Sequence, residues 1–119
     1  MATAPKTYLD IQPVGDISVV SFTINKVIDE QVIEAIGKQL FSLVDDRGIN
    51  KIVLNFMKVD YLSSFMIGKL VTLNKKVTAA KGKLALCCID AKIADIFTIT
   101  GLNKVFKMFK EEHEALQSM

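Results

Sequence analysis

The stretch KIVLNFMKVDYLSSFMIGKL, residues 51–70, carries the signals that decide the fold. Its first part, Lys51–Phe56, is a short and continuously apolar run, which is typical of a strand covered on both faces in a parallel sheet. After a polar turn, Ser63 and Ser64 open a second pattern with apolar residues at three- and four-residue spacing. This spacing predicts a helix from Ser64 to about Ala80, whose inward positions are Ile67, Leu70, Val71, Leu73 and Val77. A strand, a turn and a helix in this order form the repeating unit of an α/β fold.

The residues before this stretch predict a hairpin followed by a helix. Ile17–Ile24 is β-branched and roughly alternating, and Tyr8–Gln12 forms the preceding arm. Pro13–Asp16 supplies the turn conformations that join them. Glu30–Asp46 has the periodicity of a helix with one apolar face, and Asp29 is placed to cap its first turn.

The residues after this stretch continue the alternation of strands and helices. We expect a buried strand at Leu84–Ile89, a short helix at Ala91–Thr98, an edge strand at Val105–Phe109 and a terminal helix at Glu111–Gln117. Strands that alternate with helices predict a mainly parallel sheet with crossover helices. With the leading hairpin, this gives an α/β fold with a mixed, four- to five-stranded sheet and flanking helices.

Composition bounds the class of protein. The chain has 119 residues, of which 50% are hydrophobic and 24% charged, as expected of one soluble globular domain over residues 1–119. The net charge of +2 is small and the lysines are scattered, which indicates no nucleic-acid surface. The N-terminus lacks the apolar core of a signal peptide, and no apolar run is long enough to span a bilayer. We expect a cytoplasmic protein that binds neither membrane nor nucleic acid.

Few residues offer catalytic or metal chemistry. Cys87 and Cys88 are the only cysteines, and neighbours on a strand point to opposite faces, so a disulfide between them would be strained. They are expected to be small buried residues in a reducing compartment. His113, the only histidine, has no nucleophile near it in sequence and is expected to be a solvated helix residue. With no metal-ligand spacing and no glycine-rich phosphate loop, the chain is predicted to be neither an enzyme nor a carrier of a metal or cofactor.

The adjacent serines have two interpretations. A serine before a helix accepts a hydrogen bond from a free N–H group of the first turn, and this capping role needs no further function. A helix N-terminus also stabilises negative charge. A phosphate on a serine there would add about −1.5 to −2 charges without unfolding the helix. Ser63 and Ser64 therefore form either a plain cap or a site of regulated phosphorylation.

A family resemblance favours the second interpretation. VVSFTI, Val27-Ile28-Asp29, KIVLNF, YLSSFMIGKL, GKLALCCI and IFTITGLNKVF together resemble a STAS domain of the bacterial anti-sigma factor antagonist (anti-anti-sigma factor) group over nearly the full length. In that family the turn after the third strand carries a motif like Asp-Ser-Ser/Thr-Gly-Leu-Gly, whose first serine accepts a phosphate. With Ile67 and Gly68 in the places of the family's Leu and last Gly, the acceptor falls on Ser64, and a one-residue slip makes Ser63 the alternative.

The resemblance also implies partners and a mechanism. The unphosphorylated protein would bind an anti-sigma factor that is itself a serine protein kinase of the histidine-kinase-like ATPase type, and a PP2C-type phosphatase is a further candidate partner. Phosphorylation would weaken this docking. The implied partner-binding residues are Asp29, Ser63, Ser64, Phe65 and Met66. Phe65 and Met66 depart from the family motif, because they replace a small residue and a glycine.

The sequence also allows two alternative functions and two oligomeric states. A scaffold or interaction module without a switch would also use the serines as caps. A small-ligand or nucleotide sensor would use the same strand-to-helix surface, where sites gather in α/β sheets. The oligomeric state is predicted only as a monomer or a weak dimer, because the leading hairpin leaves an edge strand free to pair.

Overall fold

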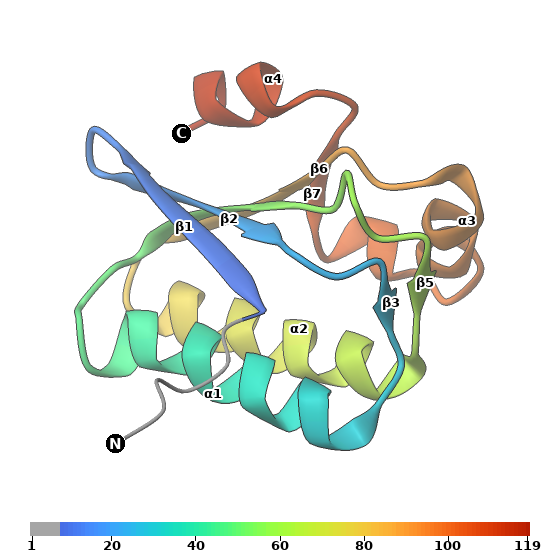
Figure 1. The fold of residues 1–119 in the computed structure, drawn as a ribbon. Coiled ribbons are helices and arrows are strands. Elements are labelled where there is room, and N and C mark those ends of the chain that lie inside the picture. The colour runs from blue at the N-terminus through green and yellow to red at the C-terminus, as the bar shows by residue number, and fades with distance from the viewer. Residues whose placement is uncertain (1–7) are drawn as a thin grey trace.

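The computed structural model describes residues 8–119, which fold as a sheet layered between helices (Figure 1). The strands are β1 (Leu9–Val14), β2 (Ile17–Phe22), β3 (Lys26–Val27), β4 (Lys51–Asn55), β5 (Tyr61–Leu62), β6 (Lys83–Cys87) and β7 (Lys107–Phe109). The helices are α1 (Glu30–Asp45), α2 (Ser64–Ala79), α3 (Ala91–Ile99) and α4 (Glu112–Gln117), with a short 3-10 helix η1 (Leu102–Lys104) after α3.

The main sheet has five strands in the order β1-β2-β4-β6-β7. β1 runs antiparallel to β2, and the other neighbouring strands are parallel. The predicted α/β fold with a mixed sheet and crossover helices is confirmed. β1 and β7 lie at the two edges, as expected of the leading hairpin and of the short strand near the C-terminus.

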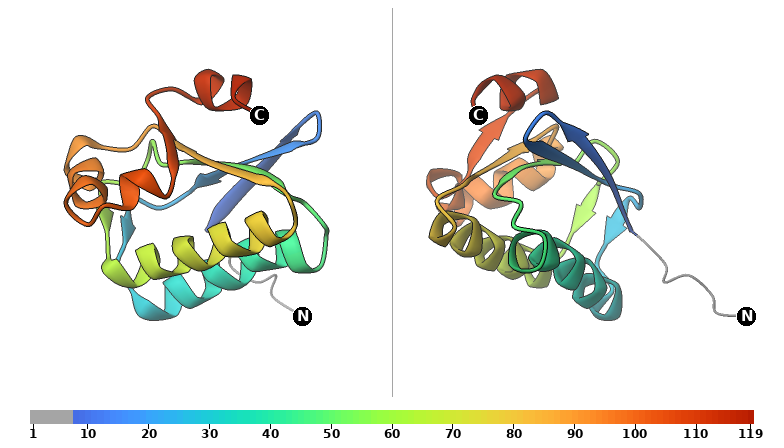
Figure 2. Two further views of the ribbon diagram at one scale, coloured as in Figure 1. Left: turned by 180° about the vertical axis from the view of Figure 1, so that it is seen from behind. Right: turned by 90° about the vertical axis from the view of Figure 1, so that its left-hand side faces the viewer.

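The sheet is covered on both faces, which explains its continuous apolar runs. Val20, Leu54 and Leu86 belong to the large core beneath α1 and α2. Val19, Val53 and Ala85 belong to a smaller cluster that includes Ala115 of α4. Figures 1 and 2 show α1 and α2 side by side on one side of the sheet and α4 on the other. Alternate residues of each central strand are therefore buried against different helices.

The boundaries differ from the predicted ones mainly at the hairpin. β1 continues through Pro13 to Val14, so the turn is shorter than predicted and consists of Gly15 and Asp16. Gly15 has a positive φ of 64°, which a residue without a Cβ adopts easily. Pro13 is tolerated because an edge strand leaves one side of its backbone unpaired.

Several other predicted strands also end or begin within one or two residues of the prediction. β2 ends at Phe22, two residues before the predicted end at Ile24. β7 begins at Lys107, because Val105 and Phe106 follow η1 and are not part of the strand. Phe106 is instead buried, with its ring centroid 5.7 Å from that of Phe97 in α3.

Candidate functional site: paired helix starts

A second, very small sheet places the starts of α1 and α2 together. Its strands β3 and β5 have two residues each and pair in parallel, with Val27 opposite Leu62. The backbone N–H of Ser63 then donates to the carbonyl of Val27, at 3.0 Å. Because Asp29 and Ser64 each lie two residues beyond this matched pair, the two helices begin side by side (Figure 1). The sequence analysis did not predict this pair, since two residues are too few to show a period.

Asp29 is the N-cap of α1. Its side chain accepts a hydrogen bond from the backbone N–H of Val32, with an N–O distance of 3.0 Å. The predicted cap is confirmed, and the Asp29 side chain is exposed. A carboxylate in this position neutralises part of the positive end of the helix.

At the start of α2 the two serines have different environments. Ser63 is the N-cap, and its Oγ accepts from the backbone N–H of Met66 at 3.4 Å. Ser64 is the first helical residue and is exposed. Among the described residues, its hydroxyl has no hydrogen-bond partner. One serine therefore holds the helix start, and its neighbour presents a free hydroxyl to solvent.

The two bulky residues after the serines, Phe65 and Met66, differ in burial. Phe65 is 40% exposed, whereas Met66 is fully buried in the core. The prediction that Met66 contacts a partner is therefore wrong for its side chain. The reason is helical geometry, because Met66 shares the inward face of α2 with Leu70 and Leu73. Phe65 lies one position earlier and points away from that face.

Phe65 is held by a lysine. Lys69 lies one turn further along α2, and its Nζ is 5.0 Å from the centroid of the Phe65 ring. The same Nζ is 2.9 Å from Oε1 of Glu34 in α1, which makes an ion pair. The Lys69 side chain lies across Gly37 of α1, where an added Cβ would approach its Cδ to 3.2 Å. Lys69 thus links the two helices and contacts the exposed aromatic ring of Phe65.

Two further apolar side chains are exposed beside the helix starts. Tyr61 of β5 and Ile28, which follows β3, are each 54% exposed. The Nζ of Lys26 lies 5.7 Å from the centroid of the Tyr61 ring. We define the helix-start surface as Ile28, Asp29, Tyr61, Ser63, Ser64 and Phe65. The sequence analysis missed Ile28 and Tyr61, because exposure of a single apolar residue leaves no periodic signal.

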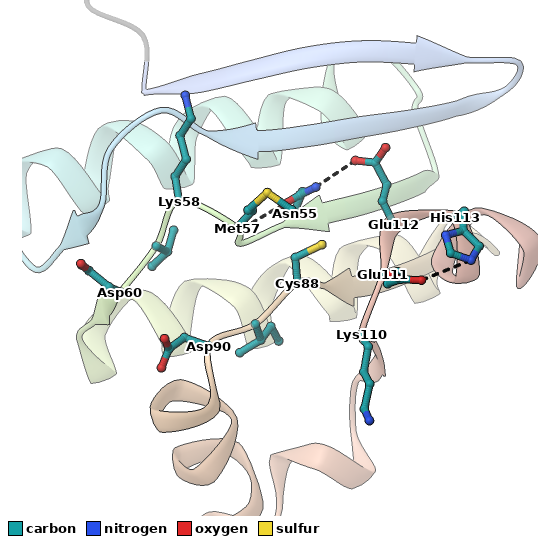
Figure 3. Close-up of a pocket in the computed structure, with 12 residues that line it drawn as sticks. Asn55, Met57, Lys58, Asp60, Cys88, Asp90, Lys110, Glu111, Glu112 and His113 are labelled. Carbon is teal, nitrogen blue, oxygen red and sulfur yellow. Dashed lines mark hydrogen bonds and ion pairs between the residues drawn. The ribbon is translucent and has the colours of Figure 1, made fainter.

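A separate concave feature lies at the carboxyl ends of β4 and β6 (Figure 3). It is an open hollow of about 830 Å³. Its polar lining comes from the β4 end, the β6 end and the start of α4, and includes Asn55, Cys88, Asp90, Lys110, Glu111, Glu112 and His113. Parallel sheets bind ligands at this edge, so the hollow is the second candidate site of the molecule.

Several polar groups of the hollow already hold the fold. Nδ2 of Asn55 donates to Oε1 of Glu112 at 2.9 Å, which fastens α4 to the sheet (Figure 3). Oδ1 of Asp90 accepts from the backbone N–H of Lys92 and caps α3. His113 is exposed, as predicted, and its Nε2 is 3.4 Å from Oε2 of Glu111.

Cys87 and Cys88 depart from the predicted arrangement. β6 ends at Cys87, so Cys88 lies outside the strand and adopts a positive φ of 61°. Cys87 is buried as predicted, but Cys88 is only half-buried. Both residues pack against the cluster beneath α4 and do not point to opposite faces. The alternation rule fails here because it holds only while the backbone is extended.

Two other kinds of site are absent from residues 8–119. No group of three or more His, Cys, Asp or Glu side chains in this part of the chain is arranged to hold a metal ion. No described helix is both long and apolar enough to cross a bilayer.

Residues 8–115 match the family model of the STAS domain, and the chain belongs to that family. The predicted family resemblance is confirmed.

Several similar proteins are named as anti-sigma factor antagonists. A Thermotoga neapolitana protein, the TM1081 homologue assigned as an anti-sigma factor antagonist, is 28% identical over 95 residues, covering 80% of this chain and 84% of its own. The crystal structure of the Thermotoga maritima protein TM1081, with the same assignment, superposes with a TM-score of 0.82 at 25% identity over 92% of each chain. The phosphorylated form of the Bacillus protein SpoIIAA has the same fold, with a TM-score of 0.73 at 18% identity over 92% of this chain and 97% of its own.

Proposed function

We propose that this protein is an anti-sigma factor antagonist whose binding is switched by phosphorylation of Ser64. Unphosphorylated, it binds an anti-sigma factor through the helix-start surface and so frees a sigma factor. The anti-sigma factor is a serine protein kinase of the histidine-kinase-like ATPase type, which supplies the ATP and magnesium. A PP2C-type phosphatase restores the unphosphorylated form. The proposal places these events in the cytoplasm and assigns no catalytic step to this chain.

The observation that carries the proposal is the division of roles between the two serines. Ser63 accepts the capping hydrogen bond from Met66, whereas the Ser64 hydroxyl is exposed and has no partner among the described residues. Modifying Ser64 therefore breaks no hydrogen bond of the fold. Modifying Ser63 would remove the cap of α2. This difference supports Ser64 over Ser63 as the acceptor, in agreement with the resemblance.

Electrostatics explain why a phosphate would change binding more than stability. The first turn of α2 contains no acidic residue. A phosphate on Ser64 would lie at the positive end of the helix, which stabilises negative charge. The charge of the phosphate would add to that of the Asp29 carboxylate on the same surface, where Lys69 and Lys26 are the neighbouring cations. A partner that packs against Phe65 would then have to desolvate this charge or place a cation against it.

The apolar residues of the same surface are suited to protein docking. Ile28, Tyr61 and Phe65 are exposed to 54%, 54% and 40%. Aromatic side chains are frequent among the residues that dominate binding energy at interfaces. The ring of Phe65 is also restrained by Lys69, which lowers the entropy lost when a partner immobilises it. Phe65 and Ser64 are adjacent, so one kinase-controlled charge lies next to the expected anchor.

Phosphate transfer to the chain is the direct test of the acceptor. The purified protein is incubated with Mg-ATP and, in turn, each anti-sigma factor kinase encoded in the source genome. Intact-mass analysis should show the gain of one phosphate group in the wild type and in Ser63→Thr, which keeps the capping hydroxyl. No gain is expected in Ser64→Ala.

A parallel capture experiment tests whether phosphorylation releases the bound kinase. The kinase that modifies the protein should be retained by immobilised wild type and Ser64→Ala, and released when the wild type is phosphorylated. A phosphate gain that survives in Ser64→Ala contradicts the assignment of the acceptor. Equal capture of the kinase by both phosphorylation states contradicts the switch and leaves a scaffold as the better account.

A further inference from the structure

The two cysteines form a pair that the proposed function does not use. Cys87 is fully buried at the end of β6, and the positive φ of Cys88 turns its side chain toward the same cluster beneath α4. Burial raises the pKa of the Cys87 thiol, and the neighbouring Cys88 adds to the effect. The pair is therefore a vicinal dithiol with both sulfur atoms on one side of the sheet.

Cys88 is the accessible member of the pair. Cys88 is half-buried and lines the hollow of about 830 Å³ at the strand ends (Figure 3). Met57, Val59 and Ile89 add apolar surface to the lining of the same hollow. A small reagent with an apolar substituent can reach Cys88 first. Cys87 then follows as the second thiol, because it is the neighbouring residue in the chain and belongs to the cluster against which Cys88 packs.

The geometry selects among reagents that bind two thiols. Adjacent Cα atoms are about 3.8 Å apart across a trans peptide, whereas the Cα atoms of an ordinary disulfide are roughly 4.4–6.8 Å apart. A direct disulfide is therefore strained. A single atom inserted between the sulfur atoms lengthens the bridge and relieves this strain. The pair favours a reagent that contributes one bridging atom.

The ionisation of Cys87 distinguishes between a metal ion and a neutral covalent reagent as the ligand of the pair. A divalent metal such as Zn²⁺ needs both thiols as thiolates. Burial raises the pKa of the Cys87 thiol, since the charged form is desolvated, and the nearby Glu112 carboxylate adds to the effect. A neutral covalent bond to sulfur places no charge in this buried position. We propose that Cys87 and Cys88 form a binding site for trivalent arsenic compounds, whose organic substituent lies in the hollow.

The bonds and electrons of this reaction balance without an oxidant. The hydrated form of phenylarsine oxide, with two hydroxyl groups on arsenic, reacts with the two thiols. Two As–O bonds and two S–H bonds break, two As–S bonds form, and two water molecules leave. Arsenic stays trivalent throughout. The thiol protons leave with the hydroxyl groups, so no thiolate remains in the product.

The test uses the folded chain and phenylarsine oxide as the probe. The protein is incubated with the probe and then with excess glutathione, which removes arsenic held by one thiol. Native mass spectrometry should find one retained phenylarsenic group on the wild type and on Ser64→Ala, which leaves the site intact. Cys87→Ser and Cys88→Ser should each release the group roughly 100-fold faster, because two linked bonds hold far longer than one.

A variant that keeps the fold separates loss of the arsenic site from loss of folding. Cys88→Ala changes only the half-buried member of the pair, and its melting curve should match that of the wild type while arsenic retention is lost. Retention in either single-cysteine variant that equals the retention in the wild type overturns the proposal. Release of arsenic from the wild type as fast as from Cys88→Ala also overturns it. Loss of the adduct after prior addition of Zn²⁺ overturns it too, because zinc binding would require both thiols to be ionised. A 2,3-dimercaptopropanol wash should return the wild type to its unmodified mass.

Discussion

The helix-start surface and the strand-end hollow use polar side chains in opposite ways. At the helix starts, Asp29 and Ser63 satisfy the backbone, and Ser64 is left without a partner among residues 8–119. In the hollow, Asn55, Glu112 and Asp90 are engaged in holding α4 and α3. A chemical change at Ser64 should therefore alter binding and spare the fold, whereas a change at Glu112 should loosen the fold itself. This difference supports the exposed and uncommitted hydroxyl of Ser64 as the proposed regulatory site.

The largest expected effect separates the two neighbours Phe65 and Met66. Met66→Ala should lower the free energy of unfolding by roughly 2–5 kcal/mol, because it opens a cavity in the core. Phe65→Ala should lower it by no more than about 1 kcal/mol, since the ring is 40% exposed. Urea denaturation followed by circular dichroism measures both. Similar losses in the two variants would remove the distinction between core and surface in this turn.

A smaller effect is expected in the hollow. Glu112→Ala should lower the free energy of unfolding by roughly 1–2 kcal/mol, since the half-buried amide of Asn55 loses a charged acceptor. Amide hydrogen exchange should rise in α4 and stay unchanged in α2. Glu112→Gln is the matched control, because its side-chain carbonyl still accepts from Asn55 and should preserve most of the stability. If α4 exchanges at the wild-type rate in Glu112→Ala, this contact does not hold the helix.

The two serines should differ modestly in stability. Ser63→Ala should lower the free energy of unfolding by roughly 0.5–1 kcal/mol, the low part of the range for a lost N-cap, because the capping contact is 3.4 Å long. Ser64→Ala should stay within about 0.5 kcal/mol of the wild type. Thermal melting at matched concentrations compares them. The opposite order would exchange their roles and favour Ser63 as the phosphate acceptor.

The smallest effect concerns a surface pair outside both regions. Nζ of Lys51 is 2.8 Å from Oδ2 of Asp16, and this hydrogen bond and charge lower the pKa of Asp16. A lowered folded-state pKa stabilises the protein above the unfolded value of 3.8, and the stabilisation is lost as the pH falls through the folded-state pKa. Lys51→Gln should raise the pKa of Asp16 toward 3.8 in an NMR titration. An unchanged pKa would show that the pair does not form in solution.

Much of the fold was predictable from periodicity, and the paired helix starts were not. The central strands and both long helices have buried faces that repeat along the chain, so their positions agree with the prediction to within a residue or two. β3 and β5 have two residues each and derive their structure from pairing with each other. Such pairing depends on a contact between distant segments, which no local pattern records.

The site was predictable in its location more than in its details. Asp29 and the serines follow from capping chemistry, because Asp and Ser are suited to a free helix N-terminus. The inward direction of Met66 depends on where the helix begins, and a shift of one residue turns the side chain by about 100°. The positive φ of Cys88 depends on the tertiary path from β6 to α3, so alternation along the strand predicted its direction wrongly.

The central claim is that a phosphate on Ser64 changes docking and leaves the fold intact. The most direct measurement is calorimetric titration of the captured anti-sigma factor with two forms of the protein, one unmodified and one carrying phosphoserine at residue 64. The account predicts that the phosphorylated form binds at least about tenfold more weakly, which corresponds to about 1.4 kcal/mol, with an unchanged melting curve. Equal affinity of the two forms, or weaker binding accompanied by loss of folded structure, would contradict it.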